Sequence, residues 1–258
     1  MPYFVVATTK FSTVLINIRI FLLFKIALLL ENKLEILFED NHLIAINKKA
    51  GQLAQGDRTG DTSLDQLVKQ YIKKKYGKPG DVFLGVIHRL DRPVSGVILY
   101  ARTSKALARM NRLFKEHKIQ KNYWCIVKER PQPEEGTLSH FLVKNEDQNK
   151  SYAYTKPKPN TKPASLDYRL ISSSDRYHLL EVILHTGRHH QIRCQFAKIG
   201  SPIRGDLKYG YHRTNKDASI NLHARSLEFI HPVKNDQVRI LAPVPSDQLW
   251  KALTTQFD

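Results

Sequence analysis

The sequence predicts an α+β fold in which a large mixed, mostly antiparallel sheet is flanked by helices. Many short segments rich in β-branched and aromatic residues lie between turn residues, whereas only a few segments have the 3.6-residue periodicity of an amphipathic helix. Strands that follow one another without intervening helices favour such a sheet over alternating βαβ units. The chain has 258 residues, 41% of them hydrophobic, so disorder is excluded and one packed domain is expected.

The domain is expected to begin with a hairpin and a helix. Two apolar segments, 34–40 (LEILFED) and 43–48 (LIAINK), flank the turn residues at 40–42. Residues 61–63 (Asp-Thr-Ser) then open a helix. Its apolar face, at helical spacing, is formed by Leu64, Leu67, Val68, Tyr71 and Ile72.

A strand, a loop and a second strand follow. Residues 82–90 (VFLGVIHRL) predict a buried strand, 92–96 (RPVSG) a loop and 97–102 (VILYAR) another strand. This arrangement presents Asp91 at the end of an apolar segment. A helix is expected from Ser104 to about His117, and its inward residues are Leu107, Met110, Leu113 and Phe114.

The second half of the chain is dominated by strands. Five strand-like segments are rich in β-branched and aromatic residues: 121–130, 137–143, 151–156, 164–171 and 177–184. The segment Lys144–Lys162, rich in Lys, Asn and Pro, predicts an extended hairpin or loop. A helix is expected from about His189 to a C-terminal cap at Gly200. Two strands and a last helix complete the chain at 221–232, 237–243 and 246–253.

Charge and cysteine content limit the class of function. The chain has 41 Lys and Arg residues against 24 Asp and Glu, a formal net charge of +17, which points to a polyanionic partner. The two cysteines, Cys125 and Cys194, are too few for a disulfide scaffold or a cysteine-rich zinc site. We therefore expect a reducing, cytoplasmic location.

The N-terminal residues 1–31 form an apolar extension, separate from a domain at 32–258. Residues 11–30 are mostly apolar, and no small-residue cleavage site follows them, which disfavours a signal peptide. A membrane anchor is the alternative to an extension or a peripheral helix. The cost of burying Arg19 and Lys25 offsets the apolar gain, so membrane association is disfavoured but stays open.

Several classes of enzyme lack their motifs in this sequence. No phosphate-binding glycine loop, dinucleotide fingerprint, nucleophile elbow or zincin motif is present, so no nucleotide cofactor is expected. The HRLD sequence at 88–91 lacks the Asp directly after Arg that marks a kinase catalytic loop. Three histidines and a cysteine between residues 185 and 194 are interleaved with arginines, so no metal site is expected there.

Two clusters of polar residues are candidates for chemistry. Asp91 is flanked by Arg89 and Arg92, which favour its ionised form as a nucleophile or base. The alternative is an ordinary salt-bridged Asp in a turn. Residues 186–193 (TGRHHQIR) form a cationic entry to a helix, suited to binding phosphate or a carboxylate. Tyr123, near the start of a strand, has a ring that can stack on a base, although core packing is the commoner fate of such a residue.

Taken together, these segments resemble the RluA-type pseudouridine synthases. Residues 88–96 (HRLDRPVSG) are similar to that family's H-R-L-D-x-x-[TV]-S-G signature, and 187–193 (GRHHQIR) to its G-R-x-H-Q-I-R motif. Lys121-x-Tyr123 resembles its K-x-Y motif, which alone carries little weight. The segments 200–210 and 222–227 are also similar. The resemblance covers about Leu34 to Leu253, with the motifs in the family's order and spacing.

The resemblance implies an active-site cleft across the sheet and an enzyme that isomerises uridine to pseudouridine in ribosomal or transfer RNA without a cofactor. Asp91 would be the catalytic residue, Arg193 its ion-pair partner, and Tyr123 the ring that stacks on the target base and moves a proton. Arg89 would occupy the place of the extruded nucleotide. The other residues expected to bind RNA are His88, Arg92, Ser95, Lys121, Arg188, His190 and Gln191.

Two departures from the family pattern and two rival functions remain. The apolar N-terminal segment cannot form the small RNA-binding domain that many members carry, so the catalytic domain itself would choose the target. Val94 replaces the Thr of many members with a residue of similar shape. The main rival is a catalytically silent RNA-binding protein of the same fold, which intact Asp91, Tyr123 and Arg193 disfavour. A nuclease would need a metal-binding carboxylate cluster, which does not stand out.

Overall fold

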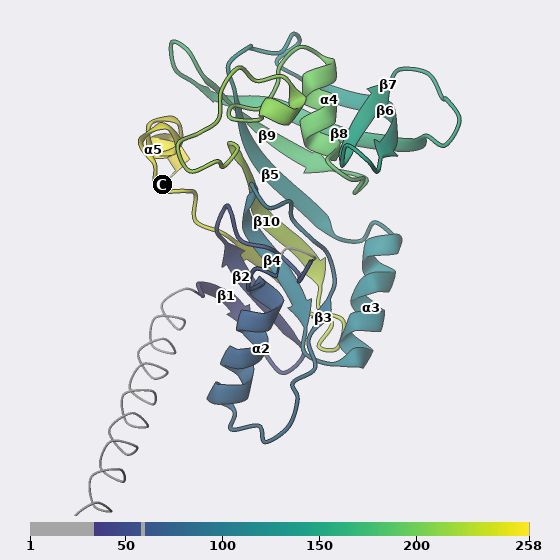
Figure 1. The fold of residues 1–258 in the computed structure, drawn as a ribbon, viewed down its shortest axis with the longest axis vertical. Helices are drawn as coiled ribbons and strands as arrows, with labels where there is room; N and C mark the ends of the chain where they lie inside the picture. Colours follow the sequence, from purple (N-terminus) through teal and green to yellow (C-terminus); the bar gives the residue numbers. More distant parts are fainter. Residues whose placement is uncertain (1–33, 58–59, 258) are drawn as a thin grey trace, which may run out of the picture.

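A computed structural model describes residues 34–57 and 60–257, and all 11 strands in these residues form one sheet. The order across the sheet is β1-β2-β4-β10-β5-β9-β8-β6-β7, with β11 also paired to β10 and β3 to β4 (Figure 1). The pair β4 and β10 is parallel, and the other pairs are antiparallel. The predicted α+β fold with a mixed, mostly antiparallel sheet is therefore confirmed.

The strands vary from 2 to 12 residues in length. Their bounds are β1 Ile36–Glu39, β2 Leu43–Lys48, β3 Gly85–Val86, β4 Ser95–Ala101, β5 Gln120–Val127, β6 Glu135–Asn145, β7 Lys150–Tyr154, β8 Lys162–Ser173, β9 His178–Leu184, β10 Leu222–Ile230 and β11 Gln237–Leu241. The helices are α2 Leu64–Lys75, α3 Ser104–Lys115, α4 Gln191–Lys198 and α5 Gln248–Thr254, with short 3₁₀ helices η1 Leu207–Tyr209 and η2 Thr255–Phe257.

Local hydrogen bonds explain where the first elements begin. In the turn between β1 and β2, the Asp40 carboxylate accepts hydrogen bonds from the backbone N–H groups of His42 and Leu43, each at 2.8 Å. The side chain of Gln66 accepts from the backbone N–H of Ser63 at the start of α2, and the Thr103 hydroxyl accepts from Ala106 at the start of α3. The predicted hairpin and both helices are present.

The predicted strand at 82–90 is wrong over most of its length, because only β3 is a strand there. One edge of β4 is paired with β2 throughout. On the other edge, β3 pairs only with Tyr100 and Ala101, and β10 pairs only with Ser95 and Gly96. On this edge, only residues 97–99 of β4 lie between the two pairings, which is too short a stretch to pair with the whole predicted strand. Residues 87–94 form a loop instead.

The polar segment Lys144–Lys162 was predicted to be an extended hairpin or a loop, and it includes the tip of a hairpin. Strands β6 and β7 are antiparallel, with Asn145 paired to Lys150 at the tip. The predicted helix at 189–200 begins at Gln191, and its N-cap residue His190 has a left-handed backbone with φ of +52°. Gly200 follows the helix at φ of +80°, consistent with the predicted glycine cap.

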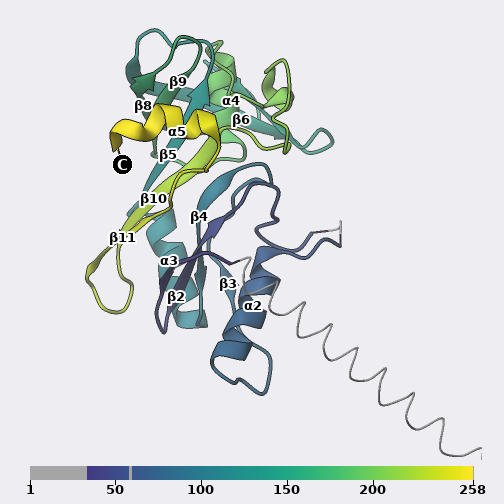
Figure 2. The same cartoon turned by 90° about the vertical axis from the view of Figure 1, so that its left-hand side faces the viewer.

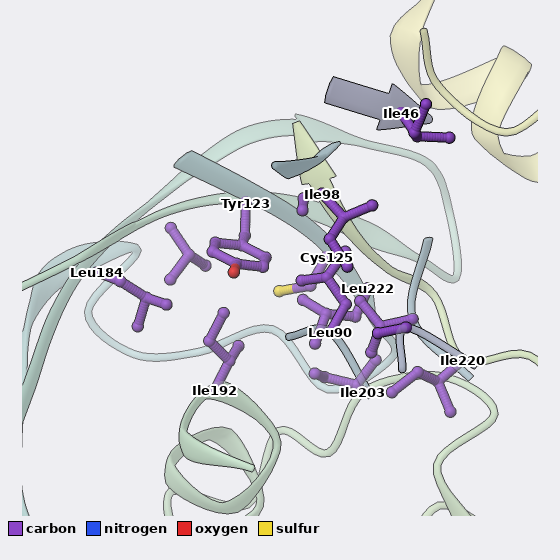
Figure 3. Close-up of a cluster of buried hydrophobic side chains, with 14 of the residues drawn as sticks. Ile46, Leu90, Ile98, Tyr123, Cys125, Leu184, Ile192, Ile203, Ile220 and Leu222 are labelled. Carbon is purple, nitrogen blue, oxygen red and sulfur yellow. The ribbon is translucent and has the colours of Figure 1, made fainter. Parts of the chain in front are cut away.

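The helices cover both faces of the sheet (Figure 2). Alternate residues of β5 point to opposite faces. Tyr123 and Cys125 belong to a core cluster that also contains residues of α2 and α4. Trp124 and Ile126 on the other face pack with Trp250 and Leu253 of α5. Figure 3 shows the first cluster around Tyr123, with Leu184 and Ile192 near its ring.

Among the described residues, no helix has the length and apolar character needed to cross a bilayer. The apolar run at 11–30, and with it the proposed extension 1–31, lies outside the described residues.

Candidate active site

A cleft of about 810 Å³ lies across the centre of the sheet, over β5, β9 and β10. Its walls come from the loop at 87–94, the turn at 187–190 and the start of α4. The sequence places these segments about a hundred residues apart, and the fold brings them together. The site residues expected from the sequence line this cleft, with the exception of Ser95.

Asp91 and Arg193 form an ion pair in the cleft. Arg193 Nη1 donates to Asp91 Oδ2 at 2.9 Å. The Arg193 side chain is 5% exposed, whereas that of Asp91 is 29% exposed, so the carboxylate reaches the cleft and the guanidinium lies behind it. This arrangement leaves Asp91 accessible to a bound molecule and places a fixed cation beside its carboxylate.

A second carboxylate, which the sequence did not single out as a site residue, holds Arg193 in place. Asp206 is 1% exposed and accepts two hydrogen bonds from Arg193, from Nε at 2.7 Å and from Nη2 at 2.8 Å. Such a two-point contact fixes the plane of a guanidinium. Hydrogen bonding and charge from Asp206 and Asp91 raise the pKa of Arg193 against the effect of burial. In the sequence, the feature that could have pointed to Asp206 was the Gly-Asp pair at residues 205–206.

Lys48 is another residue of the site that sequence reasoning missed. Its side chain is fully buried at the end of β2, and its ammonium donates to the backbone oxygens of Val94 at 2.6 Å, Arg92 at 3.1 Å and Asp91 at 3.2 Å. Burial lowers the pKa of Lys48 to about 7, against the opposing charge of Asp91. The residue thus ties down the loop that carries Asp91. In the sequence, the one feature that could have pointed to Lys48 was its place at the end of the apolar run LIAINK.

Tyr123 forms part of the cleft floor. Its ring is 9% exposed and lies beside Leu184 and Ile192 (Figure 3). Burial, and then the charge of Asp91, raise the pKa of the Tyr123 hydroxyl, so the group stays protonated at neutral pH. A flat apolar ring beside a carboxylate is suited to stacking on a planar base.

Three of the predicted RNA contacts have side chains that bind the protein itself. His88 Nε2 accepts from the backbone N–H of Leu99 at 3.0 Å, and Ser95 Oγ lies 2.8 Å from Nδ1 of buried His223. Gln191 Oε1 accepts from the backbone N–H of Arg188 at 2.9 Å. The contacts of His88 and Gln191 shape the walls of the cleft, whereas Ser95 lies outside its lining.

The predicted arginine and lysine contacts give the cleft a positive lining. Arg89 and Arg92 are exposed, and Arg92 also pairs with Asp61 at 2.8 Å. Arg188 is anchored by its Nε to the backbone oxygen of Pro163 at 3.1 Å. The other lysines that line the cleft are Lys121, Lys144 and Lys208. A cleft with this lining attracts phosphate groups.

Among the residues that the structure describes, no group of three or more His, Cys, Asp or Glu side chains is arranged to hold a metal ion. His189 and His190 stack on each other, with ring centroids 3.7 Å apart, and His190 Nδ1 lies 2.9 Å from the hydroxyl of Tyr209. His185 lies apart from them, 2.7 Å from Asp167.

Comparison with known proteins places this site in context. Residues 42–198 match the RNA pseudouridylate synthase family. The tRNA pseudouridine synthase C of Vibrio parahaemolyticus is 32% identical over 244 residues, which cover 88% of this chain and 96% of that protein. The ribosomal large subunit pseudouridine synthase D of Zymomonas mobilis is 32% identical over 232 residues, covering 85% and 73% of the two chains. The structure of human RNA Pseudouridylate Synthase Domain Containing 4 has the same fold, with a TM-score of 0.70 at 24% identity, covering 86% of this chain and 92% of that one.

Proposed function

The chain belongs to the RNA pseudouridylate synthase family and is an isomerase that forms pseudouridine in RNA, and we propose that Asp91 is its catalytic residue. The observation that carries the proposal is the carboxylate of Asp91, exposed to the cleft and held by buried Arg193 at 2.9 Å. Removing Arg193 from water and fixing it with Asp206 positions this pair before any substrate binds.

The chemistry matches the groups in the cleft. Uridine and pseudouridine are isomers: the bond from C1′ to N1 breaks, the uracil turns, and a bond from C1′ to C5 forms. One proton leaves C5 and one is gained at N1. An ionised carboxylate can add to the sugar, add to the base or remove a proton from the sugar, and the exposure of Asp91 in the cleft is compatible with each of these routes. Tyr123, which keeps its proton, is the neighbouring group suited to proton transfer and stacking.

The target uridine must leave its stack to reach Asp91. Arg89 is exposed at the cleft and is suited to fill the place that the base vacates. A smaller cleft of about 430 Å³ shares His88 and Arg89 with the main one and extends to Lys69 on α2. We assign the RNA strand to this continuous path, from Lys144 and Lys208 past Asp91 to Lys69.

Transfer RNA is the substrate that the relatives favour. The relative from Vibrio parahaemolyticus is named for tRNA and is covered over 96% of its length. The test is to incubate the purified protein with unmodified tRNA and, separately, with large-subunit rRNA, and to map pseudouridines chemically. New pseudouridine in tRNA is expected. Pseudouridine in rRNA alone would overturn the choice of tRNA, and binding without pseudouridine in either RNA would favour a catalytically silent binding protein.

We further propose that the reaction needs neither a metal nor a nucleotide cofactor and takes place in the cytoplasm. The isomerisation balances without an oxidant or a phosphate donor, and the two described cysteines are free and buried. Turnover that EDTA abolishes and added metal restores would contradict the first point. A protein found only in the membrane fraction of cells would contradict the second.

A further inference from the structure

Two nitrogen atoms approach the same oxygen of Asp91. Arg193 Nη1 donates to Oδ2 at 2.9 Å, and His190 Nε2 lies 3.4 Å from that atom. Within the described part of the chain, the hydrogen bond that Asp91 accepts goes to Oδ2, and none is made to the other oxygen, Oδ1. The two carboxylate oxygens therefore differ in their hydrogen bonding, and Oδ1 is the one that no protein group donates to.

The hydroxyl of Tyr209 determines which ring nitrogen of His190 carries the proton. Tyr209 accepts a hydrogen bond from the backbone N–H of Ser151 at 2.8 Å, and its hydroxyl lies 2.9 Å from His190 Nδ1. The phenol still has its own proton to donate, and an unprotonated Nδ1 is an acceptor within reach. Nδ1 then has no proton, and the hydrogen of the neutral ring is on Nε2, facing Asp91.

Burial keeps both groups in the required protonation state. It raises the pKa of the Tyr209 hydroxyl, so the phenol proton stays in place, and it lowers the pKa of His190 to about 3, so the ring is neutral. For His190 the charge of Asp91 acts in the opposite direction but is outweighed. The His190 side chain is 7% exposed.

The position of the ring is fixed by its neighbours. It stacks on His189 with ring centroids 3.7 Å apart and meets the Tyr209 ring edge-on at 5.6 Å. Its backbone has φ of +52° at the N-cap of α4, a conformation that costs energy for a residue other than glycine. The surrounding structure thus holds the Nε2 atom at Asp91 without a substrate.

We propose that His190 is a positioning residue: its Nε2–H donates to Oδ2 of Asp91, so that Oδ1 is the oxygen that reacts with the nucleoside. The inference rests on the proposed catalytic role of Asp91. A nitrogen-to-oxygen distance of 3.4 Å is long for a hydrogen bond, and such contacts often shorten when substrate fills the site. This role differs from direct binding of RNA by His190, which would appear in affinity.

Three variants separate these roles. His190→Leu removes the N–H donor, whereas His190→Gln offers an amide N–H at a similar distance from the backbone. Tyr209→Phe keeps the ring but removes the hydroxyl that selects the tautomer. Tyr168→Phe is the matched control, because it removes a tyrosine hydroxyl that donates to Pro133 O at 2.8 Å outside the cleft.

The first measurement is the single-turnover rate of pseudouridine formation at saturating enzyme, together with the Kd for RNA. Loss of a hydrogen bond to a charged group predicts a rate about tenfold or more lower in His190→Leu, with Kd within about threefold of wild type. The rate should recover in part in His190→Gln and be unchanged in Tyr168→Phe. An unchanged rate in His190→Leu, or a loss confined to Kd, would overturn the proposal.

The second measurement needs no activity and is made on the enzyme alone. Long-range ¹⁵N–¹H correlation of histidine-labelled protein reports which ring nitrogen bears the proton. The Nε2–H tautomer is expected for His190 in wild type and a mixture in Tyr209→Phe. An Nδ1–H ring in wild type would refute the inference. If instead Asp91→Asn keeps full activity while the tautomer is as expected, the proposed function of Asp91 fails and the hydrogen-bond arrangement stands.

Discussion

At the scale of single residues, Arg193 has a proposed role in catalysis and a place in the buried core of the site. Its guanidinium is buried between Asp206, which is 1% exposed, and the accessible Asp91. A buried ion pair gives little net stability, because both groups lose their hydration, but breaking it leaves a charge without its partner. The proposed role of Arg193 is therefore to position Asp91, and this position depends on all three side chains, Asp91, Arg193 and Asp206.

The variant Arg193→Ala is expected to lose stability as well as turnover. With Arg193 removed, buried Asp206 has no cation, which typically costs about 3–5 kcal/mol. Urea unfolding measures this loss, and Arg193→Lys, which keeps a charge but cannot form both contacts, should lose less. Turnover at a temperature where each variant is folded should fall more than RNA affinity does. A free energy of unfolding within about 0.5 kcal/mol of wild type would contradict this account of the triad.

Lys48 makes stability depend on pH in a definite direction. Its pKa falls from 10.5 to about 7 on folding because burial disfavours the charged ammonium. Between these values the unfolded chain binds more protons at Lys48 than the folded chain, so this residue's contribution makes the folded state more stable as pH rises. We therefore expect the free energy of unfolding of wild type, relative to that of Lys48→Met, to rise from about pH 7 to about pH 10. A difference that is constant or decreases over this range would show that Lys48 is not perturbed in this way.

At the scale of elements, periodicity predicted the helices and most strands because each buries one face against a neighbour. The alternating pattern of β5, with Tyr123 and Trp124 on opposite faces, is visible in the sequence and present in the structure. The prediction of a strand over residues 82–90 was wrong because β3 and β10 both pair with the same edge of β4. A local sequence pattern does not indicate which strands pair with an edge. Asp91 lies in a loop for the same reason.

The side chain of His88 takes the place of the missing strand. Its Nε2 accepts the backbone N–H of Leu99 at 3.0 Å, on the edge of β4 between the residues that pair with β3 and β10. Burial lowers the pKa of His88 to about 4, which keeps the ring neutral and able to accept.

Replacing His88 by Leu should therefore leave a buried N–H group without an acceptor. This is expected to lower the free energy of unfolding by about 1–3 kcal/mol. Denaturant unfolding measures the loss, and filter binding should show RNA affinity close to that of wild type. Unchanged stability with weaker RNA binding would instead make His88 a direct contact to RNA, as the sequence alone suggested.

At the scale of the whole molecule, the order of the strands could not be predicted from the sequence. The parallel pair of β4 and β10 joins segments more than a hundred residues apart and requires Gly96, which has φ of +112°, because a Cβ there would lie 2.2 Å from Ala224 O. The motifs identified Asp91, Tyr123 and Arg193 as site residues. Asp206, Lys48 and Tyr209 were missed as members of the site because their partners are distant in sequence.

Part of the positive charge behind the net charge of +17 lines the cleft, where it can bind the phosphates of RNA. Lys144 and Lys208 line it from the β6–β7 hairpin and from η1. Replacing both by Ala should weaken RNA binding and make it less dependent on salt. The slope of log K against log salt should become shallower by about 0.7 for each single-strand phosphate that the variant no longer neutralises. Titrations at several salt concentrations test this, with exposed Lys251 on α5 replaced as the control. A weaker affinity with the slope unchanged would show that these lysines do not bind phosphates.

The central claim is that Asp91 performs the isomerisation in the cleft. The most direct measurement compares Asp91→Asn with wild type in pseudouridine formation on RNA, alongside the Kd of both proteins for that RNA. The variant keeps the size of the side chain but removes the charge that pairs with Arg193. Pseudouridine formation is expected to vanish while RNA binding remains. Wild-type amounts of pseudouridine formed at the wild-type rate by the folded variant would contradict the account.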